Sequence, residues 1–512
     1  MKHFIILLIG LVSVFCIYAQ NPNWQNKDLQ TDTVFGISTE KAYSTLINPK
    51  KAKSVLVAVI DGGVDTAHED LKSIIWVNPH EVYNGKDDDH NGYADDVHGW
   101  DFIGGPGGDI HYETLELTRL IRKEHAMYDS LPESQIPEQY LKMKKDYDKQ
   151  LARAKATEDR ITKFRDMVDS LVQKIGKENP TREDFQNYQP VNDGEKNVKF
   201  IMLNQLQHTP DYSAFKKQMA DGIDHFKTLL DYHLSLSYDP RSIVGDDIRD
   251  SVQRDYGNDD VTGPDANHGT HVSGIIGAVR DNNIGVKGIA DKVEIMAVRV
   301  VPDGDERDKD VANGIRYAAD NGARVINMSF GKAYSPNKSV VDDAVKYAMS
   351  KDVLIVHAAG NDGEDLDSSN NFPNRHYIGG GEAGAWIEVG ASGEKNDSNL
   401  IASFSNYGKT TVDVFAPGVR IYSSTQGNHY EYYSGTSMAS PVVAGLAALI
   451  REYYPKLTAV QVKDIIMRSV VKVDHPVYVK DGYGKKKLVS FSDVCISGGI
   501  VNAYNALQLA KQ

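Results

Sequence analysis

Cysteine is scarce in this chain, and so are apolar runs long enough to cross a membrane. The 512 residues include only 2 cysteines, Cys16 and Cys495. Residues 1–19 begin with Lys2 and continue as a short apolar run that ends at Ala19, which predicts a signal peptide and not a membrane span. Cleavage after Ala19 would remove one of the two cysteines, so an internal disulfide bond in the exported chain is excluded.

Positive charge is also in short supply. The chain has 57 lysine and arginine residues against 71 aspartate and glutamate residues, a formal net charge of −14 at pH 7. Nucleic acids and anionic membranes both attract basic surfaces, so this balance argues against either as the main partner. The hydrophobic share of 41% is typical of a globular protein with a sizeable core. We therefore expect an exported globular protein, periplasmic or extracellular, whose oligomeric state the sequence leaves open.

Apolar, β-branched runs recur along most of the chain and predict buried parallel strands. The first run covers residues 54–60 and ends at Asp61. Helical patterns lie between several of the runs, notably at 310–320 and 340–350. Alternating strands and helices predict an α/β fold, with a mainly parallel central sheet and helices on both of its faces. The other runs cover residues 293–301, 324–329, 353–358, 386–389 and 412–415.

The strand pattern stops between about residues 105 and 245, where the chain becomes charged and prone to form helices. Between Tyr140 and Ile175 the apolar residues are spaced mostly by three or four, which predicts one stripe on a long amphipathic helix or an approximate coiled-coil seam. Two roles remain open for this helical insertion. It either packs on itself, or it serves as a lid or an intramolecular chaperone over an active site.

Ser437 lies at the start of an apolar helical run, in the segment SGTSMASP of residues 434–441. We expect Pro441 in the first helical turn, where a missing N–H is tolerated. A serine before a helix is by itself most often a cap. Small flanking residues and the positive end of the helix dipole also suit a nucleophile, provided that other groups activate the hydroxyl.

Two further segments carry groups that could activate Ser437. A serine hydroxyl needs a general base, and the base needs a group that orients it and stabilises its charge. Asp61 ends the first predicted strand in VIDGGVD, residues 59–65, where a carboxylate suits the orienting role. His268 lies in NHGTHVSG, which leads into a small apolar helix expected at 274–279. Taken singly, an aspartate in a turn or a lone histidine proves little.

In this chain order and with these flanks, the three segments closely resemble the active-site motifs of the subtilisin-like serine peptidases, or subtilases. The resemblance covers about residues 24–102 and 246–512 and leaves out the helical insertion. It implies a subtilisin-like α/β fold and a peptidase whose chemistry requires no cofactor. Asp61 then corresponds to the orienting acid, His268 to the general base and Ser437 to the nucleophile.

Further segments match the same family. Asn361, in the segment AAGNDG, corresponds to the asparagine that stabilises the oxyanion together with the Ser437 backbone N–H, and loss of such a donor costs about 3 kcal/mol. A second segment corresponds to the one that lines the first specificity pocket and pairs with an extended substrate: Asn327, Ser329, Phe330 and Gly331. Lys332 stands where the family often has a second glycine, so the shape of the pocket stays open. By the same comparison, His271 and His68 are structural.

Two departures from the family concern the helical insertion. His268 follows Asp61 by 207 positions, far more than in compact family members, because the insertion lies between them. Only about 30 residues separate the predicted cleavage site from the first strand, which leaves no room for the usual folding prodomain. The predicted organisation has four segments: a signal peptide at 1–19, a peptidase domain in two parts at 20–104 and 246–512, and the insertion at 105–245.

Residues 87–96, DDDHNGYADD, resemble the first nine positions of a calcium loop, with oxygen donors at alternate positions and glycine at the sixth. The twelfth position holds His98 and not the bidentate glutamate, so an acidic surface turn is the alternative. The candidate ligands of a structural calcium ion are Asp87, Asp89, Asn91 and Asp95.

The leading interpretation is a secreted serine endopeptidase that hydrolyses protein or peptide substrates through a Ser-His-Asp triad and an acyl-enzyme. One alternative is a catalytically weak or inactive relative that binds peptides in the same cleft, although no residue of the triad is missing. The other is a scaffold or adhesion protein in which the helical insertion is the functional part.

The insertion supplies a first prediction. If it assists folding or controls access to the active site, deletion of residues 107–240 will lower the folding yield or alter activity on whole proteins. The yield of folded protein and the hydrolysis of a protein substrate measure the two effects. Full retention of both would contradict the hypothesis.

Overall fold

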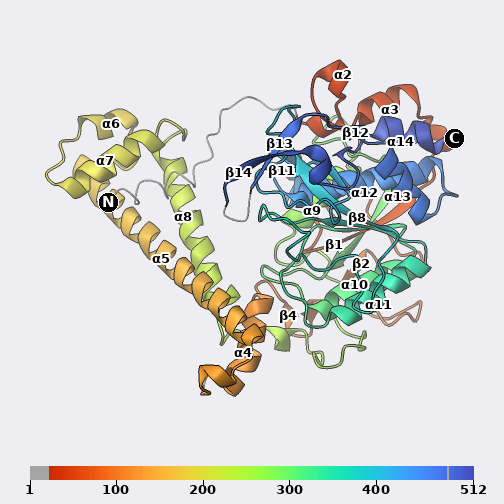
Figure 1. The fold of residues 1–512 in the computed structure, drawn as a ribbon, viewed down its shortest axis with the longest axis horizontal. Helices are drawn as coiled ribbons and strands as arrows, with labels where there is room; N and C mark the ends of the chain where they lie inside the picture. The colour runs from red at the N-terminus through yellow and green to blue at the C-terminus, as the bar shows by residue number, and fades with distance from the viewer. Residues whose placement is uncertain (1–21, 129, 481–483) are drawn as a thin grey trace. The chain divides into compact units, whose positions relative to one another are not determined.

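The computed structural model describes residues 22–128, 130–480 and 484–512, and it divides into two compact units (Figure 1). We call Asn21–Glu116 with Asp239–Gln512 the sheet unit and Leu117–Tyr238 the helical unit. The predicted signal peptide lies outside the described residues. No helix among the described residues has both the length and the apolar character needed to cross a membrane.

A nine-stranded sheet forms the centre of the sheet unit, in the order β12-β15-β9-β8-β7-β6-β1-β5-β2. All neighbouring strands run parallel except β12 and β15. The strands are buried on both faces, which explains their nearly continuous apolar sequences. Their bounds are β1 (Val55–Asp61), β2 (Gly99–Asp101), β5 (Val293–Arg299), β6 (Val325–Met328), β7 (Leu354–Ala358), β8 (Trp386–Ser392), β9 (Val414–Pro417), β12 (Val471–Lys472) and β15 (Gly499–Ile500).

Helices cover both faces of this sheet, as predicted. Along β1, Val57 and Val59 pack in one core with α9 (Asn267–Gly277) and α12 (Thr436–Tyr453). The alternate residues Ala58 and Ile60 pack in a second core with α10 (Asp308–Asp320) and α11 (Lys338–Ser350). Successive side chains of a strand point to opposite faces, so each face of the sheet has its own helical layer.

Smaller elements complete the sheet unit. Among the described residues, three antiparallel strand pairs lie outside the central sheet, and short helices lie near both ends of the described chain (Figure 1). Their bounds are β3 (Gly104–Gly105), β4 (Gly108–Asp109), β10 (Ile421–Thr425), β11 (His429–Tyr433), β13 (Pro476–Lys480), β14 (Lys486–Ser490), α2 (Leu29–Asp32), α3 (Thr39–Thr45), α13 (Ala459–Arg468) and α14 (Ala503–Ala510).

Strand β1 lies at the point where successive strands change from one side of the sheet to the other. The chain passes from β1 to β2 and β5 on one side of it and then to β6 on the other side. In open parallel sheets, a crevice forms at the carboxyl ends of strands at such a switch point. Asp61 ends β1, and Ser329 directly follows β6. The topology therefore gathers residues from distant segments at one edge of the sheet.

Two helix boundaries differ from the sequence-based expectation. Helix α9 spans Asn267–Gly277 and not 274–279, because the Thr270 N–H already donates to the Ala266 carbonyl at 3.0 Å. Helix α12 begins at Thr436, so Pro441 is its sixth residue and lies in the second turn. An interior proline removes the hydrogen bond to the carbonyl four residues earlier, which here belongs to Ser437.

The helical unit contains the predicted long helix. Helix α5 runs from Glu138 to Ile175 over 38 residues and packs against α7 and α8 (Figure 1). One apolar core, which includes Phe164, Val168 and Met202, joins these helices, so this region packs on itself. The bounds of the unit's helices are α4 (Glu116–Tyr128), α5 (Glu138–Ile175), α6 (Arg182–Asn187), α7 (Asp193–Gln205), α8 (Tyr212–Thr228) and the π-helix Leu229–His233.

Candidate functional site

Asp61 and His268 form a directly hydrogen-bonded pair. His268 Nδ1 lies 2.7 Å from Asp61 Oδ1, which also accepts the Gly62 N–H at 2.8 Å. The Asp61 side chain is 3% exposed, whereas that of His268 is 43% exposed. An ionised carboxylate only accepts hydrogen bonds, so the pairing assigns the proton to Nδ1 and leaves Nε2 of the neutral ring as an acceptor.

A close approach of α9 to the end of β1 makes this pair possible. A Cβ atom on Gly269 would lie 2.1 Å from the Gly63 carbonyl oxygen and 3.2 Å from Asp61 Cβ. Only glycine leaves room for the helix to pack at this distance. His268, the preceding residue, is thereby held in the first helical turn beside Asp61.

The surroundings of His268 raise its pKa. Burial alone lowers the pKa of the imidazole, but the charge of Asp61 and its hydrogen bond outweigh burial, and the net effect is a pKa above the ordinary value. The pair therefore favours the protonated ring. Such a shift suits a base that must accept a proton from a weak acid and then hold the charge.

Ser437 is the second residue of α12, and its side chain and backbone both contact Ser329. Ser437 Oγ donates to the Ser329 carbonyl at 2.9 Å, and Ser329 Oγ donates to the Ser437 carbonyl at the same distance. The second bond supplies the donor that Pro441 cannot offer to that carbonyl. Among the described residues, no hydrogen bond joins Ser437 to His268, so a turn of the hydroxyl away from Ser329 must precede any proton transfer between them.

Asn361 lies beside the start of α12 with its side-chain oxygen anchored. Its Oδ1 accepts the Thr436 N–H at 2.9 Å and the Thr436 hydroxyl at 3.1 Å. These two donors fix the orientation of the amide, so the exposed Asn361 presents its NH₂ group outward. The Ser437 N–H is one of the first donors of α12, which have no partner within the helix.

Two adjoining cavities surround these groups. One, of about 290 Å³, is lined by Asp61 and His268, and the other, of about 300 Å³, by Ser437 and Asn361. Val301 and Ser329 line both, so the two spaces meet at the carboxyl end of β6. The two cavities form one crevice. His268 lies on one side of it, and Ser437 lies on the other side with two potential donors, its own N–H and the Asn361 NH₂ group. We call this crevice the cleft.

The predicted substrate-binding segment divides into two groups. Ser329, Phe330 and Gly331 line the cavity beside Ser437. Asn327 lines neither cavity, because it belongs to β6 and is completely buried. Its Nδ2 donates to Ser329 Oγ at 2.9 Å, so it supports the cleft from beneath.

Lys332, the predicted departure from the family pattern, is buried beside the cleft. Its ammonium group lies 2.9 Å from Glu116 Oε2 and 2.8 Å from Asp308 Oδ1, and donates to the Glu306 carbonyl at 2.7 Å. The side chain is not among those that line the cavity, and it joins three segments beside it. A lysine replaces glycine here without filling the pocket.

Several residues of the cleft were not expected from the sequence. His111, Asp265 and Arg299 line the cavity of His268, while Glu306 and Asn371 line that of Ser437. Burial raises the pKa of the Glu306 carboxyl to about 8, although the charge of Lys332 acts in the opposite direction. Apart from Arg299, which ends β5, these residues come from loops without a recognisable motif. Only the position of Arg299 near the carboxyl end of the predicted run 293–301 could have pointed to one of them.

His271 and His68 lie outside the cleft. His271 Nε2 lies 3.1 Å from the carbonyl oxygens of Ile421 and Glu431, and burial lowers the pKa of the ring to about 3. His68 is completely buried, and its Nδ1 accepts the Asp70 N–H at 3.1 Å. Both rings connect backbone segments.

Three of the four predicted metal ligands are linked in the structure, because the Asn91 N–H donates to both Asp87 and Asp89 at 3.0 Å. Asp95 accepts the N–H groups of Asn84 and Gly85. Asp89 also joins Glu81 and Asp96, the carboxylate oxygens of these three lie within 4.8 Å of one another, and Asn91 Nδ2 donates to Asp96 Oδ2 at 3.1 Å. We call Glu81, Asp89 and Asp96 the carboxylate cluster.

Buried carboxylates dominate this cluster. Glu81 and Asp96 are buried, and burial raises the pKa of Asp96 to about 6. Oxygen ligands at such separations suit a calcium ion. Amide groups also stabilise the cluster, because Asn78 Nδ2 lies 2.9 Å from Asp96 Oδ1 and 3.2 Å from Asp89 Oδ2.

Comparison with known proteins identifies similarity over most of the chain. Residues 52–487 match the family described as "Subtilase family". The thermophilic serine proteinase of Bacillus sp. (strain AK1) is 45% identical over 202 residues, which is 39% of this chain and 45% of that protein. Thermitase of Thermoactinomyces vulgaris is 43% identical over 38% of this chain and 65% of its own length. The chain thus spans less than two thirds of both relatives.

One further curated protein and one solved structure also match part of the chain. Subtilisin BL of Lederbergia lenta is 41% identical over 208 residues, which is 40% of this chain and 71% of that protein. Among solved structures, one described as proteases from Pseudoalteromonas arctica is 29% identical, with a TM-score of 0.41, and covers 50% of this chain and 80% of its own.

Proposed function

The chain belongs to the subtilase family, and from that premise we propose that it is a serine endopeptidase that cleaves protein or peptide substrates through an acyl-enzyme on Ser437. The observation that carries the proposal is the 2.7 Å hydrogen bond between Asp61 and His268 at the edge of the cleft that Ser437 also lines. If His268 had only a structural role, it would need neither an exposed ring nor Ser437 in the same cleft.

In this mechanism Ser437, His268 and Asp61 have distinct roles. The Ser437 hydroxyl first breaks its hydrogen bond to the Ser329 carbonyl. His268 Nε2 then takes the hydroxyl proton while Ser437 Oγ attacks the scissile carbonyl carbon. Asp61 holds the Nδ1 tautomer and stabilises the imidazolium. His268 then returns the proton to the leaving amine, and water repeats the sequence to release the acyl group.

The developing oxyanion needs donors that are already in place. Asn361 Nδ2 and the Ser437 N–H fill this role. The two hydrogen bonds from Thr436 to Asn361 Oδ1 support it, because they aim the amide before the substrate arrives. A preorganised donor costs no reorientation in the transition state.

The proposal extends to substrate, compartment and organisation. Ser329, Phe330 and Gly331 contact the side chain before the scissile bond, and the exposed edge of this segment pairs with extended substrate backbone. The apolar segment at 1–19 directs export to the periplasm or the exterior. The insertion at 105–245, in which helices α5 to α8 share an apolar core of their own, assists folding or controls access.

A fluorophosphonate probe tests the nucleophile. We expect covalent labelling of the wild-type protein and none of Ser437→Ala, whose kcat on a peptide substrate falls on the order of 10⁶-fold. Ser434→Ala is the matched control, because its hydroxyl only accepts the Arg420 N–H, and it keeps both labelling and activity. An unlabelled wild type would favour the inactive relative or the scaffold protein, and unchanged labelling of Ser437→Ala would also refute the proposal.

The pH dependence of kcat/KM tests the Asp61–His268 pair. Activity requires neutral His268, and its pKa is raised, so the acid limb of the profile lies above the ordinary histidine value. Asp61→Asn removes the charge that raises this pKa, so the limb moves to lower pH while kcat falls on the order of 10⁴-fold. Profiles of both proteins between pH 5 and 9 measure the shift. An unmoved limb would show that another group titrates.

The proposal also includes a structural calcium ion at the carboxylate cluster. Glu81, Asp89 and Asp96 supply oxygen ligands, and a divalent cation would relieve the repulsion between three carboxylates whose oxygens lie within 4.8 Å of one another. The ion contributes stability and takes no part in catalysis.

Thermal unfolding tests the ion. We expect a chelator to lower Tm, and calcium at 100 times its Kd to add about 2.7 kcal/mol to the free energy of unfolding. Asp89→Asn removes the calcium dependence. Asp88→Asn keeps it, because Asp88 is exposed and lies outside the cluster. If chelator and calcium leave Tm unchanged, the cluster is held by its amide hydrogen bonds alone.

A further inference from the structure

Residues 301–306 follow β5 and form one wall of the cleft, and we call them the 301–306 segment. Its first half lines the cavity of His268, and its second half, which includes Gly304, lines the cavity of Ser437. Residues 329–331 also line the cavity of Ser437. Two segments from different parts of the sheet unit therefore bound one space.

The residues through which the chain enters the helical unit bind the 301–306 segment along its backbone. We call these residues, 110–116, the stem. The Asp303 N–H donates to the His111 carbonyl at 2.8 Å, and the Glu113 N–H donates to the Asp303 carbonyl at 2.9 Å. Both bonds belong to one parallel β-bridge. The stem therefore supports this wall of the cleft in the manner of a neighbouring strand.

Gly304 allows the stem to come this close. Its φ is 141°, and a Cβ atom there would lie 2.2 Å from the Glu113 carbonyl oxygen. Only glycine tolerates both this backbone conformation and this approach. A residue that lines the cavity of Ser437 is thus packed directly against the stem.

Charged side chains fasten the stem on both sides of Gly304. Asp305 Oδ2 accepts the Glu116 N–H at 2.7 Å, and Arg307 Nη2 lies 2.8 Å from Glu113 Oε2. The Arg307 and Glu113 side chains are 13% and 2% exposed, so solvent screens this ion pair little. The chain also leaves the insertion here, because Asp239 Oδ1 lies 3.5 Å from the same Arg307 nitrogen.

The stem binds the second wall of the cleft as well. Glu116 Oε2 lies 2.9 Å from the ammonium group of Lys332, the residue that directly follows Gly331. The same ammonium group donates to the Glu306 carbonyl at 2.7 Å. One short segment thus connects to both sides of the cavity of Ser437, and the width of that cavity depends on it.

We propose that the stem positions both walls of the cleft and thereby gives the peptidase a preference for substrates with several residues before the scissile bond. The inference rests on the proposed peptidase function. A substrate that pairs with 329–331 lies between this segment and the 301–306 segment, and its more distant residues contact the second one. Glu113, Asp305 and Arg307 line neither cavity, so they are positioning residues that act through the stem.

The test compares succinyl-Ala-Ala-Pro-Phe p-nitroanilide with acetyl-Phe p-nitroanilide, which share the residue before the scissile bond. For the wild type we expect kcat/KM for the long substrate to exceed that for the short one by about 100-fold or more. In Arg307→Gln the stem is loosened, and kcat/KM for the long substrate falls about tenfold or more. That for the short substrate changes less than about threefold. Asp305→Ala, a change at a half-buried residue, lowers the ratio in the same direction.

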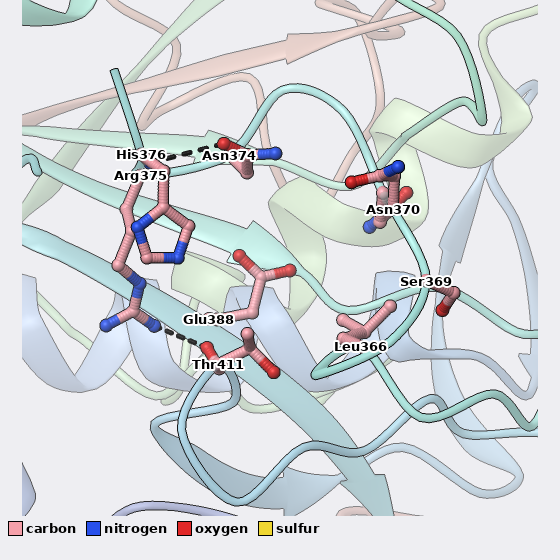
Figure 2. Close-up of a pocket in the computed structure, with 9 residues that line it drawn as sticks. Leu366, Ser369, Asn370, Asn374, Arg375, His376, Glu388 and Thr411 are labelled. Atoms are coloured by element: carbon pink, nitrogen blue, oxygen red, sulfur yellow. Dashed lines mark hydrogen bonds between the residues drawn. The ribbon is translucent and has the colours of Figure 1, made fainter. Parts of the chain in front are cut away.

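Arg375→Gln is the matched control. Arg375 pairs with Asp413 at 2.5 Å, and the two side chains are 5% and 1% exposed, so this substitution also breaks a buried ion pair. Figure 2 shows Arg375 beside Thr411 in a separate cavity of about 70 Å³, which lies away from the stem in the chain and shares no residue with it. Loss of stability alone lowers both rates by one factor, so Arg375→Gln keeps the wild-type ratio.

Fluorophosphonate labelling of every variant reports whether the active site is intact. A labelled wild type without the length preference, or labelled Asp305→Ala and Arg307→Gln with the wild-type ratio, would overturn the role of the stem alone. An equal fall of the ratio in Arg375→Gln would also overturn it. If Arg307→Gln does not fold, the ratio of Asp305→Ala decides. A wild type that is neither labelled nor active would overturn the peptidase function and this inference with it.

Discussion

The register of three neighbouring parallel strands is the constraint on which the cleft depends. Ile60 of β1 pairs with Met328 of β6, and Met328 pairs with His357 of β7. The next residues, Asp61, Ser329 and Ala358, therefore lie at one level along the carboxyl edge of the sheet. A slip of β1 by one residue would turn Asp61 to the opposite face of the sheet. Two buried helical layers hold this register, because each face of β1 packs in a separate apolar core.

Much of the fold follows from local sequence. The run 54–60 predicts β1 almost to the residue, because a buried parallel strand needs a continuous apolar, β-branched sequence. The stripe between Tyr140 and Ile175 predicts α5 for the same kind of reason, since an amphipathic helix shows its period along the chain. The motifs around Asp61 and His268 can also be identified from short segments of sequence, and the two side chains are directly hydrogen-bonded in the structure.

Other parts of the cleft have no local signal. The sequence places the start of α9 too late, because the histidine motif is itself helical and its packing depends on the absence of a side chain at Gly269. From the sequence, Lys332 could fill part of the pocket. In the structure its ammonium group instead pairs with Glu116, which lies 216 positions away in the chain and could not be predicted as its partner. The carboxylate cluster joins Asp89 to Glu81 and Asp96, two residues that the alternating pattern of Asp87, Asp89, Asn91 and Asp95 does not include. Such contacts depend on tertiary packing, which a motif does not encode.

Pro441 gives the serine an unusual neighbour. Because proline has no N–H, the Ser437 carbonyl is released from its own helix and is held by a hydroxyl from the end of β6. One residue withholds a donor and a residue from another element supplies it, so the first turns of α12 are tied to the end of β6 through the backbone of the serine itself. Loss of the Ser329 hydroxyl would leave the Ser437 carbonyl without this donor, and Pro441 offers no N–H to replace it.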